Sequence, residues 1–272
     1  MKRHGKRTAI LAVLLVLTIW TLWGNTALEI NEYRIQSGRI PKAFSGFRIA
    51  QISDLHNTEF GSGNGRLLEK LRQAEPDIIV ITGDLIDSRR TDVEVSVDFV
   101  RRAVEIAPVY YVSGNHESRV MEYDDLRKGL AEAGAVLLEF GKTSIHRDGA
   151  SITIMGVNDP AFLLDPGVFL SAMTEVSDGF TILLSHRPEL FDDYVAAGMD
   201  LIFTGHAHGG QIRLPLIGGL VAPNQGYFPQ YDAGSFTAGN TTMLVSRGIG
   251  NSLFPLRFNN RPEIVVAVLQ SE

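Results

Sequence analysis

The sequence predicts an α/β protein in which mixed β-sheets are covered by helices, preceded by one N-terminal transmembrane helix. Apolar runs typical of buried strands alternate with amphipathic helical segments in the first half of the chain, and strands able to form a hairpin follow in the second half. A long uncharged stretch lies near the amino terminus. With 44% hydrophobic residues and 27 glycines in 272 residues, the composition is that of an ordinary globular protein.

The amino-terminal stretch has the length and composition of a membrane span. Residues 9–28 carry no charge, and about 20 helical residues cover the ~30 Å of a bilayer core. Trp20 and Trp23 stand near its end, where aromatic rings lie at a membrane interface. A buried core helix is disfavoured because the stretch is not amphipathic and four basic residues flank it: Lys2, Arg3, Lys6 and Arg7.

A cleavable signal peptide is the alternative to an anchor. The best cleavage site, Asn25-Thr26-Ala27, has a bulky Asn where a small residue is preferred, which favours an uncleaved anchor. By the positive-inside rule the amino terminus stays in the cytoplasm. We therefore expect residues 1–28 to form a basic tail and a single-pass signal anchor in the cell membrane, and residues 29–272 to form one extracytoplasmic domain.

Strands and helices alternate after the anchor. A short strand near residues 30–35 is followed by a buried strand at 47–52, a helix of about twelve residues around Leu67, Leu68 and Leu71, and the strand of DIIVITGDLID. Together these make a βαβ unit. The later elements are expected in this order: helix 92–107, strand 108–117, hairpin 144–159, strand 180–189, helix 188–198, strand 200–214 and strand 264–270.

Composition excludes several functions. The chain has no cysteine, which rules out disulfides, zinc–thiolate sites and thiol nucleophiles, so catalysis must rest on oxygen and nitrogen groups. After Arg7 the chain carries 21 basic and 31 acidic residues without basic runs. A body of net charge −10 is poorly suited to binding a nucleic-acid backbone, which disfavours a nuclease.

Histidines gather where apolar strands end. Of the seven, five directly follow such strands: His56, His116, His186, His206 and His208. They stand in the strings DLH, GNHE, SHRPE and GHAHGG, and Asp54, Asp84 and Asn115 accompany them in DLH, GDLID and GNHE. Ligands of α/β sheets bind beyond the carboxyl ends of the strands. The strings therefore predict one crevice lined with metal ligands.

The spacing within two strings suggests how ions could be shared. An extended backbone would point Asp54 and His56 to the same side, so that they bind one ion. His206 and His208 have the same spacing, but the neighbouring glycines also allow a tight loop that divides this pair between two ions. D-x-H or G-D alone is more often a turn or a helix cap, and His186 alone could be a core histidine. G-N-H-E and G-H-x-H point more strongly to metal, because three ligand types are bunched at each turn, and all five strings in this order favour a metal centre.

D-x-H, G-D, G-N-H-E, H and G-H-x-H in this order resemble the calcineurin-like metallophosphoesterase superfamily over residues 45–270. The resemblance implies an α/β/β/α sandwich of two mixed sheets and two divalent metal ions. It implies Asp54, His56 and His208 on the first ion, and Asn115, His186 and His206 on the second. It also implies that Asp84 bridges both ions and that His116, a non-ligand, faces the phosphate and protonates or stabilises the leaving oxygen. Mixed N and O ligands suit Mn, Fe, Zn, Co or Ni.

GHAHGGQ, YDAG, VSRGIG and PLRFNNRPEI further resemble a bacterial membrane-associated branch that includes the YkuE and YaeI phosphodiesterases, and also resemble a chlamydial UDP-2,3-diacylglucosamine hydrolase. This implies a phosphodiesterase or phosphatase whose substrate is a phosphorylated small molecule or lipid, such as a UDP-acylglucosamine pyrophosphate. A non-catalytic membrane-anchored receptor for a phosphorylated envelope ligand is the alternative. A missing metal ligand would favour the receptor, and none is missing.

Further residues are candidates for substrate contacts. Arg187, Gln211 and Arg247 are expected near the substrate or behind the metal ligands, although an ordinary structural role is equally compatible with the sequence. The apolar stretches LPLIGGLVAP (214–223) and SLFPL (252–256) could form a patch that faces the bilayer or could be core strands.

Overall fold

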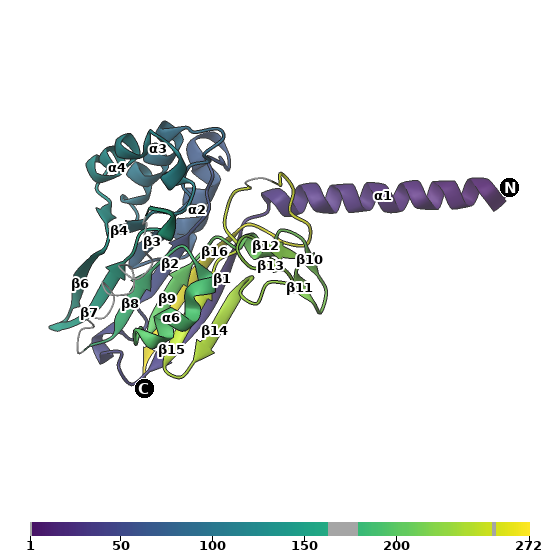
Figure 1. The fold of residues 1–272 in the computed structure, drawn as a ribbon. Helices are drawn as coiled ribbons and strands as arrows, with labels where there is room; N and C mark the ends of the chain where they lie inside the picture. The colour runs from purple at the N-terminus through teal and green to yellow at the C-terminus, as the bar shows by residue number, and fades with distance from the viewer. Residues whose placement is uncertain (1, 163–178, 252–253) are drawn as a thin grey trace.

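Two mixed β-sheets packed face to face make up the body of the protein, and a long helix, α1 (Lys2–Thr26), projects from it (Figure 1). The structure is a computed structural model that describes residues 2–162, 179–251 and 254–272. The predicted α/β fold with two mixed sheets is confirmed. Within α1, the segment Lys6–Thr26 is long and apolar enough to cross a membrane, and a signal sequence has the same properties.

The first sheet has six strands. Their spatial order is β1 (Glu29–Ser37), β16 (Glu263–Ser271), β2 (Arg48–Ile52), β3 (Ile78–Thr82), β4 (Val109–Val112) and β5 (Val136–Leu137). Strands β2 to β5 are parallel, whereas β16 runs antiparallel to β2 and parallel to β1. The carboxyl ends of β2, β3 and β4 therefore meet at one edge, as the predicted βαβ unit requires.

The second sheet also has six strands. Their order is β14 (Gly234–Ala238), β15 (Thr241–Val245), β9 (Leu201–Thr204), β8 (Thr181–Leu184), β7 (Ala150–Gly156) and β6 (Gly141–Arg147). The central four are parallel, and antiparallel hairpins close both edges. The β6–β7 hairpin confirms the expectation for residues 144–159, whereas the sequence did not lead us to expect the β14–β15 hairpin.

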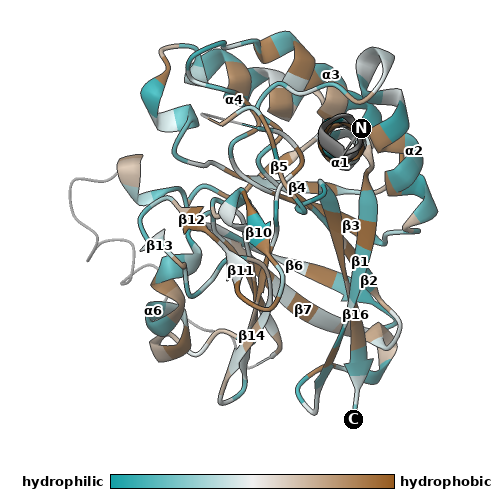
Figure 2. Cartoon of the chain, turned by 90° about the vertical axis from the view of Figure 1, so that its right-hand side faces the viewer, coloured by the Kyte–Doolittle hydropathy of each residue, from teal (hydrophilic) through white to brown (hydrophobic). Residues whose placement is uncertain are grey.

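Helices cover the outer face of each sheet. Helices α2 (Gly65–Gln73), α3 (Val93–Ala103) and α4 (Tyr123–Glu132) cover the first sheet, and α6 (Phe191–Ala196) packs on the second. Figure 2, which looks along α1, shows these layers on opposite sides of the strands. Helix α2 has nine residues instead of about twelve, because a 3-10 turn (Ser62–Asn64) precedes it. Helix α4 was not predicted.

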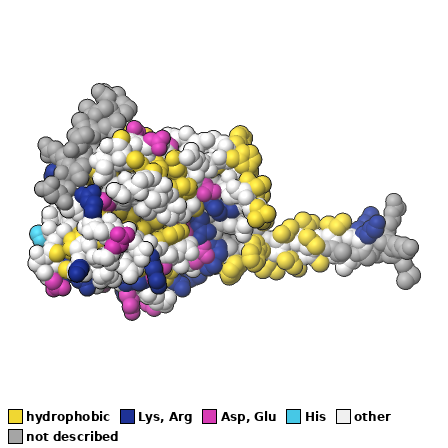
Figure 3. Space-filling model, turned by 90° about the horizontal axis from the view of Figure 1, so that it is seen from below, with side chains coloured by type: hydrophobic (Ala, Val, Ile, Leu, Met, Phe, Trp, Pro, Cys, Tyr) yellow, Lys and Arg dark blue, Asp and Glu magenta, His cyan; other side chains and the backbone are white. Residues whose placement is uncertain are grey.

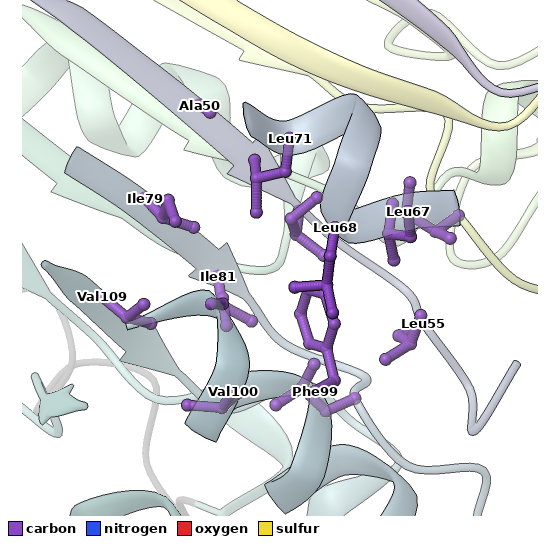
Figure 4. Close-up of a cluster of buried hydrophobic side chains, with 14 of the residues drawn as sticks. Ala50, Leu55, Leu67, Leu68, Leu71, Ile79, Ile81, Phe99, Val100 and Val109 are labelled. Carbon is purple, nitrogen blue, oxygen red and sulfur yellow. The ribbon is translucent and has the colours of Figure 1, made fainter. Parts of the chain in front are cut away.

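Two apolar layers hold the sandwich together. Between the sheets lie buried aliphatic and aromatic side chains such as Ile49, Val80, Ile182 and Phe203. Under the helices, the first sheet meets α2 and α3 through Leu67, Leu68, Leu71, Phe99, Val100, Ile79 and Ile81 (Figure 4). Burying each large side chain contributes roughly 1.5–3 kcal/mol. The packing fixes the strand ends from which the ligand strings emerge.

Four short strands form two small hairpins between β9 and β14. They are β10 (Arg213–Leu214), β11 (Gly218–Gly219), β12 (Val221–Ala222) and β13 (Gly226–Tyr227), and they lie on the side of the body from which α1 projects (Figures 1 and 2). In the stretch 214–223, Leu216 and Ile217 are exposed and Ala222 is buried. In SLFPL, residues 252 and 253 lie outside the described part of the chain, and residues 254 and 256 are exposed.

Candidate metal centre

Seven polar side chains meet where the strands of both sheets end. Loops after β2, β3 and β4 supply three of the strings, and loops after β8 and β9 supply the other two. All seven predicted ligands are buried: Asp54, His56, Asp84, Asn115, His186, His206 and His208. Buried polar groups in such density need partners.

The first group joins the β2 and β9 loops. The Nε2 atoms of His56 and His208 are 3.1 Å apart, and the Nε2 atom of His208 lies 3.3 Å from an oxygen of Asp54. Ligand atoms of the three residues are mutually close enough to surround one ion. No residue of the second predicted ligand set takes part in this group.

The second group joins the β3, β4, β8 and β9 loops. The Nε2 atom of His186 lies 3.3 Å from Asp84 Oδ2, 3.1 Å from His206 Nδ1 and 3.2 Å from Asn115 Oδ1. Since His206 belongs here and His208 to the first group, the tight GHAHGG loop divides the pair. Asp84 also lies 3.7 Å from His56 through the same oxygen, so it stands between the two groups.

The ligand loops use backbone conformations that L-residues rarely adopt. The φ angles of Asp54, His56, Asp84, His206 and His208 are 54°, 48°, 52°, 65° and 49°. The expectation of an extended DLH segment is therefore wrong: a left-handed turn, not a pleated strand, aims both side chains inward. Such conformations cost about 1–3 kcal/mol each and tend to persist at functional sites.

Glycines allow the loops to approach one another. A Cβ on Gly83 would lie 2.4 Å from the backbone nitrogen of Gly114, and one on Gly205 would lie 1.9 Å from the Ser53 hydroxyl oxygen. Both distances are far below van der Waals contact. The close packing of the β2, β3, β4 and β9 loops therefore requires glycine at these positions.

The protonation states suit metal binding. Burial lowers the pKa of His56 to about 4 and lowers those of His206 and His208 well below the usual range, so these imidazoles are neutral, the form that ligates metals. Burial also disfavours protonation of His186, but the Asp84 carboxylate outweighs it and raises the pKa of His186 to about 10. In the absence of a metal, a proton on His186 thus supplies the positive charge that offsets the buried Asp84 carboxylate.

The donor set fits divalent cations. Within the described part of the chain, neither Asp54 nor Asp84 forms an ion pair with Lys or Arg, although both are fully buried. Carboxylate, amide and imidazole donors together favour first-row transition metals. A third group of similar spacing contains His56, Asp87 and His116, but Asp87 is already paired with Arg89.

The family model for calcineurin-like phosphoesterases matches residues 47–210, which include every ligand string. The chain belongs to the calcineurin-like phosphoesterase family. Over 90% of its length it is 30% identical to the uncharacterized metallophosphoesterase YkuE of Bacillus subtilis, covering 86% of that protein. Over 82% of its length it is 28% identical to the phosphodiesterase YaeI of Escherichia coli, covering 82% of it.

Solved structures share the fold at low sequence identity. The TT1561 protein of Thermus thermophilus matches 75% of this phosphoesterase, and 91% of that chain is covered, with a TM-score of 0.51 and 14% identity. The phosphopantetheinyl hydrolase PptH of Mycobacterium tuberculosis gives a TM-score of 0.50 at 15% identity, covering 76% and 91% of the two chains. These likenesses concern the fold alone. The family and the ligand groups together identify a metal-dependent phosphoesterase.

His116 has a defined tautomer in this phosphoesterase. Its Nδ1 atom accepts a hydrogen bond from the backbone N–H of Ser88 at 2.9 Å. Burial lowers the pKa of His116, so the ring is mainly neutral at pH 7 and carries its proton on Nε2. Nε2 lies 4.0 Å from Asp84 Oδ2, beside the metal ligands.

Glu117 is a structural residue for which the sequence suggested no role. It is fully buried, and its carboxylate accepts hydrogen bonds from the backbone N–H groups of Asp84, Leu85 and Gly114 at 2.8–2.9 Å. It therefore joins the loops after β3 and β4. The only signal in the sequence is its place in the GNHE string.

Two arginines lie behind the ligands. Arg187 is buried in a bidentate pair with Asp159, and its Nη1 atom lies 3.0 Å from Nε2 of His206. Arg257, which the sequence did not single out, is buried without an acidic partner among the described residues and lies 3.4 Å from Nδ1 of His208. Both side chains therefore contact a histidine of the two groups through the ring nitrogen that faces away from the other members of its group.

A cavity of about 430 Å³ opens over the two ligand groups. Its polar lining includes Asp84, Asn115, three histidines, Arg119 and Asn224. Apolar side chains contribute more of the exposed wall: Ala207, Ile212, Val221, Ala222, Pro223 and Phe254. Gln211 lines the cavity as well. Of the other predicted substrate residues, Arg187 does not line it, and Arg247 is paired with Glu29 and Glu263 elsewhere.

Proposed function

We propose that this phosphoesterase holds two divalent ions. Asp54, His56 and His208 would bind the first ion. Asn115, His186 and His206 would bind the second. Asp84 would bridge them. The observation that carries the proposal is the position of Asp84, whose Oδ2 atom lies within 3.7 Å of histidines from both groups.

When bound, a pair of divalent ions supplies a nucleophilic hydroxide at neutral pH and offsets phosphoryl charge. The residues of the chain set the charge of the centre, donate a proton and position the ligands and the substrate. Neutral imidazoles and the Asn115 amide keep the negative charge of the centre low. His116 donates its Nε2 proton to the departing oxygen, because Ser88 holds its other nitrogen as an acceptor. Arg187 positions His206, and Gln211 contacts the substrate from the cavity wall.

The substrate we propose is a phosphodiester or phosphomonoester that carries an apolar group, such as a lipid-linked or envelope phosphate compound. Support comes from the apolar wall of the cavity and from the apolar helix α1. A relative at 28% identity is the phosphodiesterase YaeI. We further propose that α1 stays in the cell membrane as a single-pass anchor and that residues 29–272 face outward, because basic residues stand at the amino-terminal end of α1, before its apolar segment.

Hydrolysis by the purified full-length protein in detergent tests the reaction. We expect Mn²⁺-dependent cleavage of bis-p-nitrophenyl phosphate, loss of activity with a chelator, and recovery on adding the metal back. The same assay with Fe, Zn, Co and Ni identifies the preferred ion. If no divalent ion supports cleavage, the hydrolase is rejected in favour of a receptor for a phosphorylated ligand.

A further inference from the structure

Six large apolar side chains are exposed on the small hairpins and on the segment 254–256, and one of them, Phe254, lines the cavity. We call them the apolar rim: Leu216, Ile217, Tyr227, Phe228, Phe254 and Leu256. The Gln211 amide, in the loop that leads into β10, donates hydrogen bonds to the carbonyl oxygens of residues 254 and 256 at 2.9 and 3.0 Å, and so ties the segment 254–256 to the start of the small hairpins. Figure 3 shows hydrophobic side chains gathered on the end of the body that adjoins α1. Apolar groups clustered on one surface mark an interaction site.

The end of α1 is fixed to the same part of the body. Asn25 exchanges two hydrogen bonds of 2.8 Å with the backbone of Arg257, the residue after the last rim position. Arg66 donates to the carbonyl of Thr26, and Arg261 to that of Ala27. Because these bonds satisfy backbone groups at the end of the helix, the position of the rim relative to α1 is set by the fold.

The side chains near the end of α1 are those of a membrane interface. The ring centroids of Trp20 and Trp23 are 5.4 Å apart with the rings tilted by 48°, and the Arg261 guanidinium lies 5.0 Å from the ring of Trp23. Aromatic rings with basic groups beside them are typical of the headgroup level. Since a helix rises 1.5 Å per residue, Trp23 is only ~4.5 Å along the axis from Thr26, where the helix ends. The body therefore begins at that level.

We infer that the apolar rim lies in the interfacial layer of the membrane that α1 enters. Phe254 belongs both to the rim and to the cavity wall, so the cavity opens toward lipid. An ester with a long hydrocarbon chain then reaches the metal centre without leaving the bilayer. The position of the rim rests on the membrane anchoring of α1 proposed above, and the route to the metal centre rests in addition on the proposed hydrolysis.

The bilayer is the occupant that the geometry favours. The rim is continuous with α1, whose apolar side chains are exposed on all sides and must also be covered. A protein partner or a second copy of the chain would cover the rim without lipid contact. Lipid contact therefore decides between these occupants.

A single cysteine can report the surroundings of the rim, because the chain has none of its own. Full-length Leu216→Cys carrying an environment-sensitive dye, reconstituted in phosphatidylcholine nanodiscs, should show blue-shifted emission that brominated lipids quench. Ser144→Cys is the control, since residue 144 is exposed on β6, which lies on the side of the body away from α1 (Figure 1). Emission from residue 216 that brominated lipids leave unchanged would overturn the inference, whatever the protein hydrolyses.

A pair of esters tests the route to the metal centre. Methyl p-nitrophenyl phosphate in solution and hexadecyl p-nitrophenyl phosphate in the nanodisc have the same reacting group. The double variant Leu216→Asp, Ile217→Asp, whose sites do not line the cavity, should lose at least about tenfold on the hexadecyl ester and leave the methyl ester unchanged. If the double variant changes the hydrolysis rates of both esters by the same factor relative to wild type, the route is refuted.

Controls separate the possible failures. Met121→Asp, at an apolar residue that is 96% exposed outside the rim, should change neither rate. Absence of hydrolysis of both esters by wild type would reject the proposed function, and the quenching experiment would still decide the position of the rim. Quenching at residue 216 together with an unchanged hexadecyl rate in the double variant would reject the route alone.

Discussion

Asp84 is the residue on which both ligand groups depend. The Asp84→Asn variant should lose both ions, because the remaining neutral amide cannot replace the charge between His56 and His186. Elemental analysis should show metal content falling from about two ions per chain toward none. Asp87→Asn is the matched control: Asp87 is paired with Arg89, and this variant should retain its metal. Metal loss from Asp87→Asn instead would indicate that the third group is a true site.

His116 should contribute to rate and not to metal binding. We expect His116→Gln to lower kcat on the order of 10²-fold with metal content unchanged, since a positioned proton donor is lost. The loss should be larger for an alkyl leaving group than for p-nitrophenol, which departs without a proton. Steady-state kinetics on a series of leaving groups measures this difference. An equal loss across the series would contradict proton donation.

At the scale of elements, Glu117 holds two ligand loops together. In Glu117→Gln, the side-chain amide must turn an NH₂ group toward backbone N–H donors that now bond to carboxylate oxygens. Leaving such donors unpaired costs about 1–3 kcal/mol. Thermal unfolding of the metal-free protein should show this loss. An unchanged unfolding temperature would mean that the loops after β3 and β4 are held by other contacts.

The pattern of hydrophobic residues predicted some helices and strands and missed others. The apolar runs that end in polar strings predicted β2, β3, β4, β8 and β9, because buried parallel strands are continuously apolar. Helix α4 was missed, since its apolar positions are few and it is only ten residues long. Strands β14 and β15 were missed because they carry mixed side chains and one of them lies at a sheet edge.

At the scale of the whole molecule, the orientation across the membrane can be tested with cysteines. In spheroplasts, a membrane-impermeant maleimide should label Ser144→Cys, and it should label Gly5→Cys only after lysis. Basic residues at the amino-terminal end of α1 are the physical reason, because they resist translocation. A tag at the amino terminus should remain on the mature protein. Its loss would identify α1 as a cleaved signal peptide.

The sequence by itself determined the family, the α/β class and the identity of the seven grouped side chains. It could do so because ligand residues at strand ends form short local strings, and the order of those strings is read directly from the chain. The apolar stretch of α1 could also be recognised, because it is one continuous segment of the sequence.

Tertiary structure alone decided how those side chains are arranged. The left-handed turn of DLH, the division of His206 from His208 and the contact of Arg257 with His208 all depend on loops distant in sequence that pack against one another. The exposure of Leu216 and Ile217 was likewise undecided by composition. An apolar residue is equally suited to a core and to a membrane, and only packing determines which surface it meets.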